Sequence, residues 1–317
     1  MKIGTDLNYA AELIRNGKVV AIPTETVYGL AANAFDLEAV INIFEIKNRP
    51  RFNPLIVHIH DWQMLNGIAL VANIVLKLLA EKFWPGPLTI LVPKTGKIHP
   101  IVTAGSDLVA IRMPDHPVAL ELLKTLDFPL AAPSANLFGK ISPTTAKHVE
   151  SQLGYKIEYI LDGGECKVGV ESTIIKVDFE GKVVILRPGG ITAEQIAAII
   201  GYLPGIVDST GDPEAPGMLK SHYSPKIPLI IGDPDYLISK YSNKKIAVIS
   251  FFGHYRQKPV LKNFTLSANK NMHEAAKNLF SAMHDAENSG SELIISEVFP
   301  NHGIGMAIND RLKRASS

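Results

Sequence analysis

A change of composition and periodicity after residue 200 divides this 317-residue sequence into two parts. Before that point, apolar runs typical of strands alternate with amphipathic runs typical of helices. Residues 201–228 are instead rich in Gly, Pro, Ser and Asp and show little periodicity. Regular patterns resume at residue 229 and continue to the end. The sequence therefore predicts a first domain over residues 1–200, a linker over 201–228 and a smaller second domain over 229–317.

The first part holds so many strand-like runs that a mixed sheet with helices is expected, rather than a purely alternating parallel one. We predict strands over residues 18–22, 55–59, 88–92, 109–113, 130–132, 158–161, 173–177 and 183–186. Helices are predicted over 7–16, over a segment starting after Asp36, and over 67–83, 118–125 and 144–153. Asp6 and Asp36 suit N-caps, Gly17 suits a helix stop, and Ser142 or Thr144 suits the N-cap of the helix over 144–153.

The second part reads as a compact α/β unit of the Rossmann-like kind. Strands are predicted over residues 229–232, 246–250 and 293–297, and helices near 236–241, 272–288 and 304–314. About 90 residues remain for this unit, which is small but sufficient for a core of its own.

Composition excludes several classes of protein. A 46% hydrophobic content is too high for a disordered chain, and the single Cys166 excludes an internal disulfide or a thiolate metal cluster. A net charge of +1 argues against a protein that coats nucleic acid. Residues 1–16 lack the apolar core of a signal peptide, and polar residues interrupt the apolar run over 67–83. A cytoplasmic protein without a membrane span is expected.

Hydroxyl and cationic side chains follow two of the predicted strands. Thr24 and Thr26 lie in the turn PTETVYGL, where they either bind a ligand or cap backbone amides. Residues 46–60 hold Lys47, Arg49 and a third cation, Arg51, and no acid, which suits phosphate oxygens. A helix C-terminus would also explain Lys47, through the helix dipole, but explains Arg51 poorly. His58 lies in an apolar strand pattern, where a hydrogen-bonded core histidine is the more frequent interpretation.

Further candidates stand at later strand ends. Arg112 ends an apolar strand and suits either a structural acid or a ligand carboxylate. Ser134 and Asn136 follow another strand within residues 133–149, a second stretch without acids. Arg187 ends the strand over 183–186, after a Gly-bearing segment that contains Ser172. The linker carries the hexapeptide SHYSPK, whose polar, aromatic and basic character is typical of segments that close over a site.

Several catalytic motifs are absent from the sequence: a Walker A loop, the GxGxxG dinucleotide fingerprint, HExxH and the GxSxG nucleophile elbow. Strand-end hydroxyls and cations without an obvious nucleophile indicate an enzyme that positions anionic substrates. We therefore expect no metal site built by the protein's own side chains.

Seven motifs in order carry a resemblance to a known family: PTETVYGL, KNRP followed by NPLIVH, WPGPLT, AIRMP, AAPSAN, VESTII and LRPGGIT. Together they closely resemble the YrdC-like threonylcarbamoyl-AMP synthases. SHYSPK and the terminal GIGMAINDRL are similar to the longer form with a C-terminal domain. The resemblance covers nearly the whole chain and implies an α/β fold, a twisted mixed sheet with helices around a concave, positively charged cavity.

The resemblance also implies a reaction. Such enzymes join L-threonine, bicarbonate or CO2, and ATP with Mg²⁺, release pyrophosphate, and supply threonylcarbamoyl-AMP to a separate transferase complex that modifies tRNA. Threonine would be held by Thr26, His58, Arg112 and Ser172. ATP would be held by Lys47, Arg49, Asn53, Ser134, Asn136, Ser142, Arg187, Tyr223 and Ser224, with Lys47 and Arg49 stabilising phosphate charge as catalytic residues and Thr24 at lower rank.

Two positions depart from the family pattern. Asn53 stands where many relatives carry a cation, so that phosphate contact is neutral here or comes from Arg51. Ala132 replaces a hydroxyl of some relatives, which leaves only a backbone contact to threonine.

Two other functions stay open at this point. One is an RNA- or nucleotide-binding accessory protein with weak RNA affinity. Residues 1–200 oppose it, because they hold 19 Lys+Arg and 20 Asp+Glu and are net −1. The other is a carbamoyl-group enzyme of the same fold with a different acceptor, which fold alone cannot distinguish.

Overall fold

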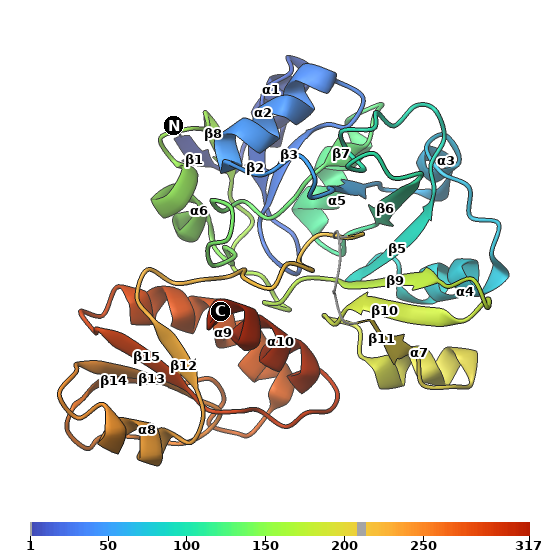
Figure 1. The fold of residues 1–317 in the computed structure, drawn as a ribbon. Helices are drawn as coiled ribbons and strands as arrows, with labels where there is room; N and C mark the ends of the chain where they lie inside the picture. The colour runs from blue at the N-terminus through green and yellow to red at the C-terminus, as the bar shows by residue number, and fades with distance from the viewer. Residues whose placement is uncertain (1, 208–213) are drawn as a thin grey trace.

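The computed structural model describes residues 2–207 and 214–317, so part of the predicted linker lies outside the described residues. Two sheets with flanking helices make up the described chain (Figure 1). The larger is an eleven-stranded mixed sheet of order β1-β8-β2-β3-β7-β4-β6-β5-β9-β10-β11, and the smaller is β12-β15-β13-β14. All pairs in the smaller sheet are parallel. The predicted combination of a mixed sheet with a smaller α/β unit is confirmed.

The larger sheet is built mostly from the predicted strands. Its strands are β1 (Lys2–Gly4), β2 (Val20–Ile22), β3 (Gly29–Asn33), β4 (Ile56–His58), β5 (Leu88–Pro93), β6 (Leu108–Arg112), β7 (Leu130–Ala131), β8 (Tyr159–Leu161), β9 (Thr173–Val177), β10 (Val183–Arg187) and β11 (Gly205–Ile206). Its helices are α1 (Leu7–Arg15), α2 (Leu37–Lys47), α3 (Trp62–Asn66), α4 (Ile74–Phe83), α5 (Pro117–Lys124), α6 (Ala146–Leu153) and α7 (Ala193–Ile200).

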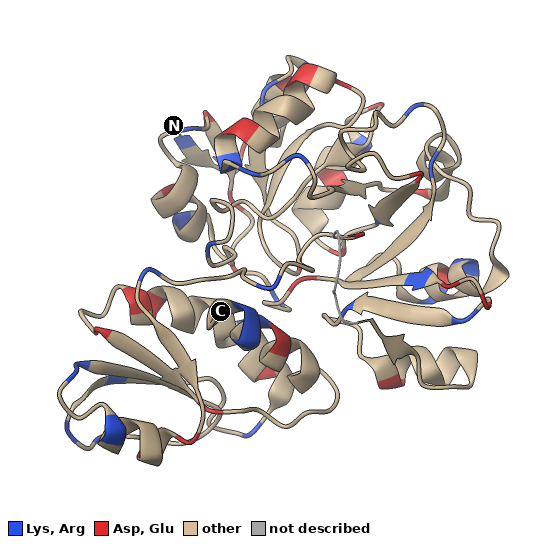
Figure 2. Ribbon diagram, viewed as in Figure 1, with Lys and Arg blue, Asp and Glu red and all other residues tan. Residues whose placement is uncertain are grey.

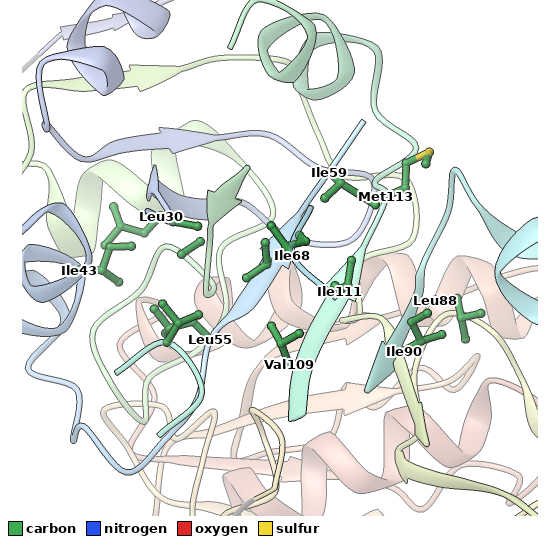
Figure 3. Packing of buried hydrophobic residues seen from close by; sticks show 14 of the residues in the cluster. Leu30, Ile43, Leu55, Ile59, Ile68, Leu88, Ile90, Val109, Ile111 and Met113 are labelled. Atoms are coloured by element: carbon green, nitrogen blue, oxygen red, sulfur yellow. The ribbon is translucent and has the colours of Figure 1, made fainter. Parts of the chain in front are cut away.

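Helices cover both faces of this sheet, and strand β2 shows the pattern. Val20 and Ile22 pack with α1 and α5 in one cluster, whereas Ala21 between them faces a second cluster with α2. This alternation follows from the two-residue repeat of a strand. The second cluster extends along the sheet and includes Leu30, Leu55 and Ile111 (Figure 3).

Side-chain caps fix the helix starts, and two of them correct the predictions. Asp6 and Asp36 accept backbone N–H groups of α1 and α2, as predicted. The predicted helix over 67–83 is wrong in its first half, because Asn73 caps Val75 and Leu76 and α4 begins only at Ile74. Neither Ser142 nor Thr144 is the N-cap of α6; Thr145 accepts the N–H of His148 instead.

The smaller sheet consists of β12 (Leu229–Ile231), β13 (Ile246–Ser250), β14 (Val260–Thr265) and β15 (Leu293–Ser296), with α8 (Pro234–Lys240), α9 (Met272–Glu287) and α10 (Gly305–Ala315). Sequence patterns missed β14, an edge strand whose residues are only partly buried or exposed and so lack an apolar repeat. They also missed the short β1 and β11 and the small-residue strand β3, GLAAN. Among the described residues, no helix is long and apolar enough to cross a membrane.

The second domain packs against the first through α9 and α10, which lie between the smaller sheet and the first domain (Figure 1). On α9, His284 lies against the backbone of residue 142, and its ring stacks on His148 of α6 with centroids 4.1 Å apart. From the linker, Ala215 and Met218 join an apolar cluster with residues of β4, β5, β6, β9 and β10. The described part of the linker therefore covers the larger sheet instead of spanning open space.

Candidate functional site

A cavity lies where β2, β4, β6 and β10 end, and residues of the linker line it; about 40 Å³ of it is open to the centres of water-sized molecules. Nine of the predicted residues line it: Thr24, Thr26, Arg49, His58, Arg112, Ser134, Ser172, Arg187 and Tyr223. Four more, Lys47, Asn53, Asn136 and Ser142, are buried outside that lining. Ser224 is also outside it and donates its backbone N–H to Gly139 O at 2.7 Å.

The turn after β2 fixes the direction of two hydroxyl groups. Thr24 Oγ1 donates its single proton to the Val27 carbonyl at 2.6 Å. The 2.9 Å contact between the two threonine hydroxyls therefore uses the proton of Thr26. Thr26 Oγ1 also accepts Nη1–H of Arg112 at 2.9 Å. With its proton committed, Thr26 can offer the cavity only a lone pair, which suits a ligand N–H or O–H.

Arg112 ends β6 beside the neighbouring strands, in register with His58 of β4 and Thr89 of β5. Its Nη2 lies 2.6 Å from Oε1 of Glu25, and both side chains are only 4% exposed. Nε of Arg112 is buried without a hydrogen-bond partner. Since a buried guanidinium nitrogen is costly to leave unsatisfied, Arg112 is suited to an acceptor from a ligand.

His58 is a neutral acceptor in this cavity. Its Nδ1 lies 3.3 Å from the Ile56 carbonyl, which can only accept, so Nδ1 carries the proton and Nε2 has a free lone pair. Burial first, and the Arg112 charge second, lower the pKa of His58 to about 3. The imidazole therefore stays uncharged at neutral pH.

Arg49 and Arg187 add two further cationic side chains to the cavity lining. Arg49 binds only neutral oxygens, the carbonyls of Asn53 and Pro54 and the Asn53 amide. Arg187 likewise binds Ser172 and the Pro216 carbonyl. Burial is the main cause that lowers the pKa of Arg49 to about 9 and of Arg187 to about 10. The charge of Arg187 further lowers the pKa of Arg49, and Arg311 and Arg112 lower the pKa of Arg187, although Glu171 opposes this. Since neither guanidinium has a carboxylate within 4.0 Å in the described part of the chain, this crowding favours a polyanionic ligand.

Lys47 supports these cationic side chains from behind the lining. Its Nζ donates to the carbonyls of Ser134 and Asn136, both at 2.5 Å, so one N–H remains. Burial and the charge of Arg49 hold the pKa of Lys47 well below its usual range. The side-chain oxygen of Asn53 accepts a hydrogen bond from Arg49, whereas its Nδ2 is a buried donor without a partner. Arg51 is exposed and is not among the residues that line the cavity.

Glu171 connects the cavity to the second domain. It accepts Ser142 Oγ–H at 2.7 Å and Nε–H of Arg311 at 2.7 Å, and Arg311 is fully buried. Burial raises the pKa of Glu171, but the charges of Arg311 and Arg187 outweigh it and hold the value at about 2. Ser142, predicted as an ATP contact, is therefore engaged with this carboxylate.

The depressed pKa of Glu171 predicts a specific acid sensitivity. Because the folded value is about 2 and the ordinary value 4.5, the contribution is complete above pH 4.5 and is lost as pH falls toward 2. That contribution is about 3 kcal/mol of unfolding free energy. In urea titrations from pH 6 to pH 3, the native protein should lose more stability than Glu171→Gln. The exposed Glu38→Gln should behave like the native protein; equal slopes for all three would contradict the prediction.

The linker closes the cavity through a strained turn. Gly217 has φ +81°, and a Cβ there would lie 3.0 Å from Arg187 Cδ and from the Tyr223 hydroxyl, so only glycine fits. Tyr223 itself has φ 64° and is 1% exposed. Its ring contacts the Arg311 guanidinium at 5.4 Å and the His222 ring at 4.2 Å. The second domain thus holds the linker in place over the cavity.

Several cavity residues were not predicted as site residues. His222 lies within SHYSPK, Glu171 within VESTII, and Pro216 and Gly217 within the predicted linker. Burial lowers the pKa of His222 to about 3, so it is neutral. Glu171 could have been noticed as an acid among cations at strand ends. Nothing in the sequence distinguished Glu25, which lies behind Arg112.

The arrangement gives one cavity with two chemically different sets of side chains. One set is Arg112, the neutral His58 and the acceptor of Thr26, which suit a small molecule with a carboxylate and hydrogen-bond donors. The other is Arg49 and Arg187, whose hydrogen-bond partners are all uncharged. Burial raises the pKa of the Cys166 thiol, so it is not an activated nucleophile. In residues 2–207 and 214–317, no group of three or more His, Cys, Asp and Glu could hold a metal ion. Blue and red segments are interspersed over both domains (Figure 2), so the cationic character is local to the cavity.

Comparison with known proteins gives two family matches. Residues 12–189 match the family described as telomere recombination (Sua5, YciO and YrdC), and residues 191–317 match the threonylcarbamoyl-AMP synthase C-terminal domain. The threonylcarbamoyl-AMP synthase of Pyrococcus abyssi is 42% identical over 98% of this chain and 94% of its own length. That of Bacillus subtilis is 43% identical over 97% of this chain and 92% of its own length.

Solved structures agree with these matches. Pyrococcus abyssi Sua5, crystallised with L-threonine, superposes with a TM-score of 0.93 at 40% identity, over 100% of this chain and 98% of that one. Escherichia coli YciO has a TM-score of 0.50 at 22% identity and covers 59% of this chain and 93% of its own. The second likeness shows a shared fold alone.

Proposed function

This chain belongs to the threonylcarbamoyl-AMP synthase family and is an enzyme of that kind, and from this premise we propose how its cavity divides the substrates. L-threonine occupies the end with Arg112, and the ATP phosphates occupy the end with Arg49 and Arg187. The observation that carries this division is the pairing of the arginines: Arg112 has a carboxylate partner, and the other two have only neutral ones.

Arg112, Thr26, His58 and Ser172 hold threonine in this proposal. The unpartnered Nε of Arg112 and its adjacent Nη2 bind the carboxylate of threonine, since guanidinium and carboxylate match as a bidentate pair. Thr26 Oγ1 and His58 Nε2 then accept from the amine and the hydroxyl of threonine. The complex of L-threonine with the Pyrococcus relative supports a threonine site in this fold. Ser172 borders the two ends, because its Oγ accepts from Arg187 at 3.1 Å.

Arg49, Arg187 and Lys47 hold the ATP phosphates, with Lys47 and Arg49 as the catalytic residues that stabilise phosphate charge. Ser134 and Tyr223 line the same cavity, while Asn53, Asn136, Ser142 and Ser224 act from behind it. Asn53 Nδ2 is free to donate to an acceptor. ATP enters with Mg²⁺ on its phosphates; the side chains here suit the phosphates and offer the ion no cluster of ligands.

The reaction needs alignment more than an enzyme nucleophile. The neutral amine of threonine attacks CO2, or bicarbonate after loss of water, which forms a C–N bond and an N-carboxylate as the amine proton leaves. A carboxylate oxygen then attacks the α-phosphorus in line, and the bond to pyrophosphate breaks. His58, neutral at physiological pH, adds no positive charge beside the amine. Arg49, Arg187 and Lys47 stabilise the charge on departing pyrophosphate.

The linker predicted over residues 201–228 lies between domains over 1–200 and 229–317, and in this proposal its residues 214–228 act as a lid. Pro216, Gly217, His222 and Tyr223 cover the cavity, and Arg311 of the second domain contacts Tyr223. A lid of this kind excludes water and retains a labile intermediate. Substrates and pyrophosphate then require the linker to open.

The product's partners follow from its chemistry. We expect a separate transferase complex to consume threonylcarbamoyl-AMP for tRNA modification, in the cytoplasm. Weak RNA binding and a different acceptor stay as alternatives, but the closed cavity and the local character of its charge favour small-molecule synthesis.

An isotope exchange experiment tests the proposal. Labelled pyrophosphate should enter ATP only when L-threonine and bicarbonate are both present, because the adenylate forms only from the N-carboxylate. Omission of either substrate is the control. Exchange without threonine, or none with the full mixture, would overturn the proposed reaction.

A further inference from the structure

Glu25 lies directly behind Arg112 and is not among the residues that line the cavity. It belongs to the turn after β2, is 3% exposed, and its backbone carbonyl accepts the N–H of Val168 at 2.7 Å. Both of its carboxylate oxygens are buried without a hydrogen-bond partner, so its contact with Arg112 is an ion pair. An acid in such a place is costly unless its charge is used, so its contacts identify its role.

Arg112 is the only cationic side chain within 4.0 Å of Glu25 in the described chain. Two other titratable groups lie near the Glu25 carboxylate, and both are neutral: burial lowers the pKa of His116 and raises that of Cys166. The charge of Glu25 therefore acts almost wholly on Arg112. Thr26 accepts a hydrogen bond from Nη1 and Glu25 forms an ion pair with Nη2, so the guanidinium has a partner at both of its terminal nitrogens.

The same pairing makes Arg112 different from its neighbours. Arg49 and Arg187 are bound by carbonyl, amide and hydroxyl oxygens, and Glu171, the acid in the cavity lining, is paired with Arg311. Of the three arginines that line the cavity, only Arg112 has a carboxylate of the described chain within 4.0 Å, while Glu171 acts on Arg187 from a greater distance. A phosphate carries more negative charge than a carboxylate. The Glu25 carboxylate beside Arg112 therefore repels a bound phosphate more than it repels a bound carboxylate.

We propose that Glu25 is a positioning and selectivity residue: its carboxylate orients Arg112 and reserves it for the carboxylate of a substrate, while phosphates are directed to Arg49 and Arg187. This inference rests on the proposed function, because it assumes that both anions enter this cavity. It predicts that the charge of residue 25 and the length of its side chain have separable effects on substrate binding.

Two substitutions separate these effects in the full-length protein. Glu25→Gln keeps the shape and removes the charge, so threonine should still bind with a KM within about threefold of native. Pyrophosphate should then compete with threonine, with an inhibition constant against threonine at least about tenfold lower than in the native enzyme. Glu25→Asp keeps the charge but is one methylene shorter, so the KM for threonine should rise about tenfold without such competition.

Steady-state rates with threonine varied at fixed pyrophosphate concentrations measure both effects, with melting temperatures to establish folding. Glu165→Gln is the matched control, because that side chain lies in a nearby loop and is 73% exposed. Binding of threonine by calorimetry, with and without inorganic phosphate, gives the same comparison for a variant too weak in turnover.

Absence of phosphate competition in Glu25→Gln, or native behaviour of Glu25→Asp, would overturn the inference. If instead Arg112→Ala leaves the threonine requirement unchanged, the proposed threonine site itself is wrong. The two failures are therefore distinguishable.

Discussion

Replacing Arg112 by alanine is expected to raise the KM for L-threonine by at least about 100-fold, while the KM for ATP changes less than about threefold. Loss of a buried, charge-assisted pair with a ligand carboxylate costs about 3 kcal/mol, and each 1.4 kcal/mol is a factor of ten. Arg49 and Arg187, which we propose bind the phosphates, make their hydrogen bonds to groups other than Arg112. Initial rates with each substrate varied in turn measure the two effects.

The removal of Arg112 has a second consequence that needs a control. Glu25 would keep a buried carboxylate without its partner, which is strongly destabilising. The double variant Arg112→Ala with Glu25→Gln removes that charge and should recover stability without recovering threonine affinity. Equal increases in the KM for threonine and for ATP would place Arg112 outside the threonine site.

Sequence patterns were sufficient to predict a feature where the role of a residue depends only on its neighbours in the chain. Asp36 before an apolar repeat is an N-cap, and the strand containing Val20 alternates between two cores, so both were predictable. Arg112 and His58 were predictable as strand-end candidates, because adjacent parallel strands bring their ends together.

The remaining features depend on contacts between distant segments. Glu25 gains its role only from Arg112, 87 positions later in the chain, and Glu171 only from Arg311 at the other end. Thr145 caps α6, while Ser142, three residues earlier, donates to Glu171. Pairings of this kind leave no periodic signal, so the candidate residues could be named from the sequence but their partners could not.

These pairings also give the second domain a physical role at the cavity. Arg311 of α10 binds Glu171, donates to the Pro188 carbonyl at 2.9 Å and stacks on Tyr223 of the linker. One side chain thus joins the first domain, the lid and the second domain. The cavity lining and the domain interface share Glu171 and Tyr223, so disturbance of the interface should reach the ATP end.

Replacing Arg311 by methionine is therefore expected to lower the free energy of unfolding by about 3–5 kcal/mol and to raise the KM for ATP. Methionine fills much of the space but leaves the buried Glu171 without the cation that hydrogen-bonds to it and removes the ion pair of Arg311 with Asp310; removal of one partner of a buried pair has a cost of that size. Tyr223 also loses the guanidinium against its ring. Urea unfolding followed by tryptophan fluorescence reports on the first domain, because Trp62 and Trp84 both lie there.

The double variant Glu171→Gln with Arg311→Met distinguishes the charge from the packing. With both charges removed, most of the lost stability should return, because the cost lies in the unpaired carboxylate rather than in the space that Arg311 fills. The raised KM for ATP should persist, because the contact with Tyr223 is still missing. If stability does not recover, packing around Arg311 carries the interface; if Arg311→Met leaves the KM for ATP unchanged, the second domain does not hold the lid.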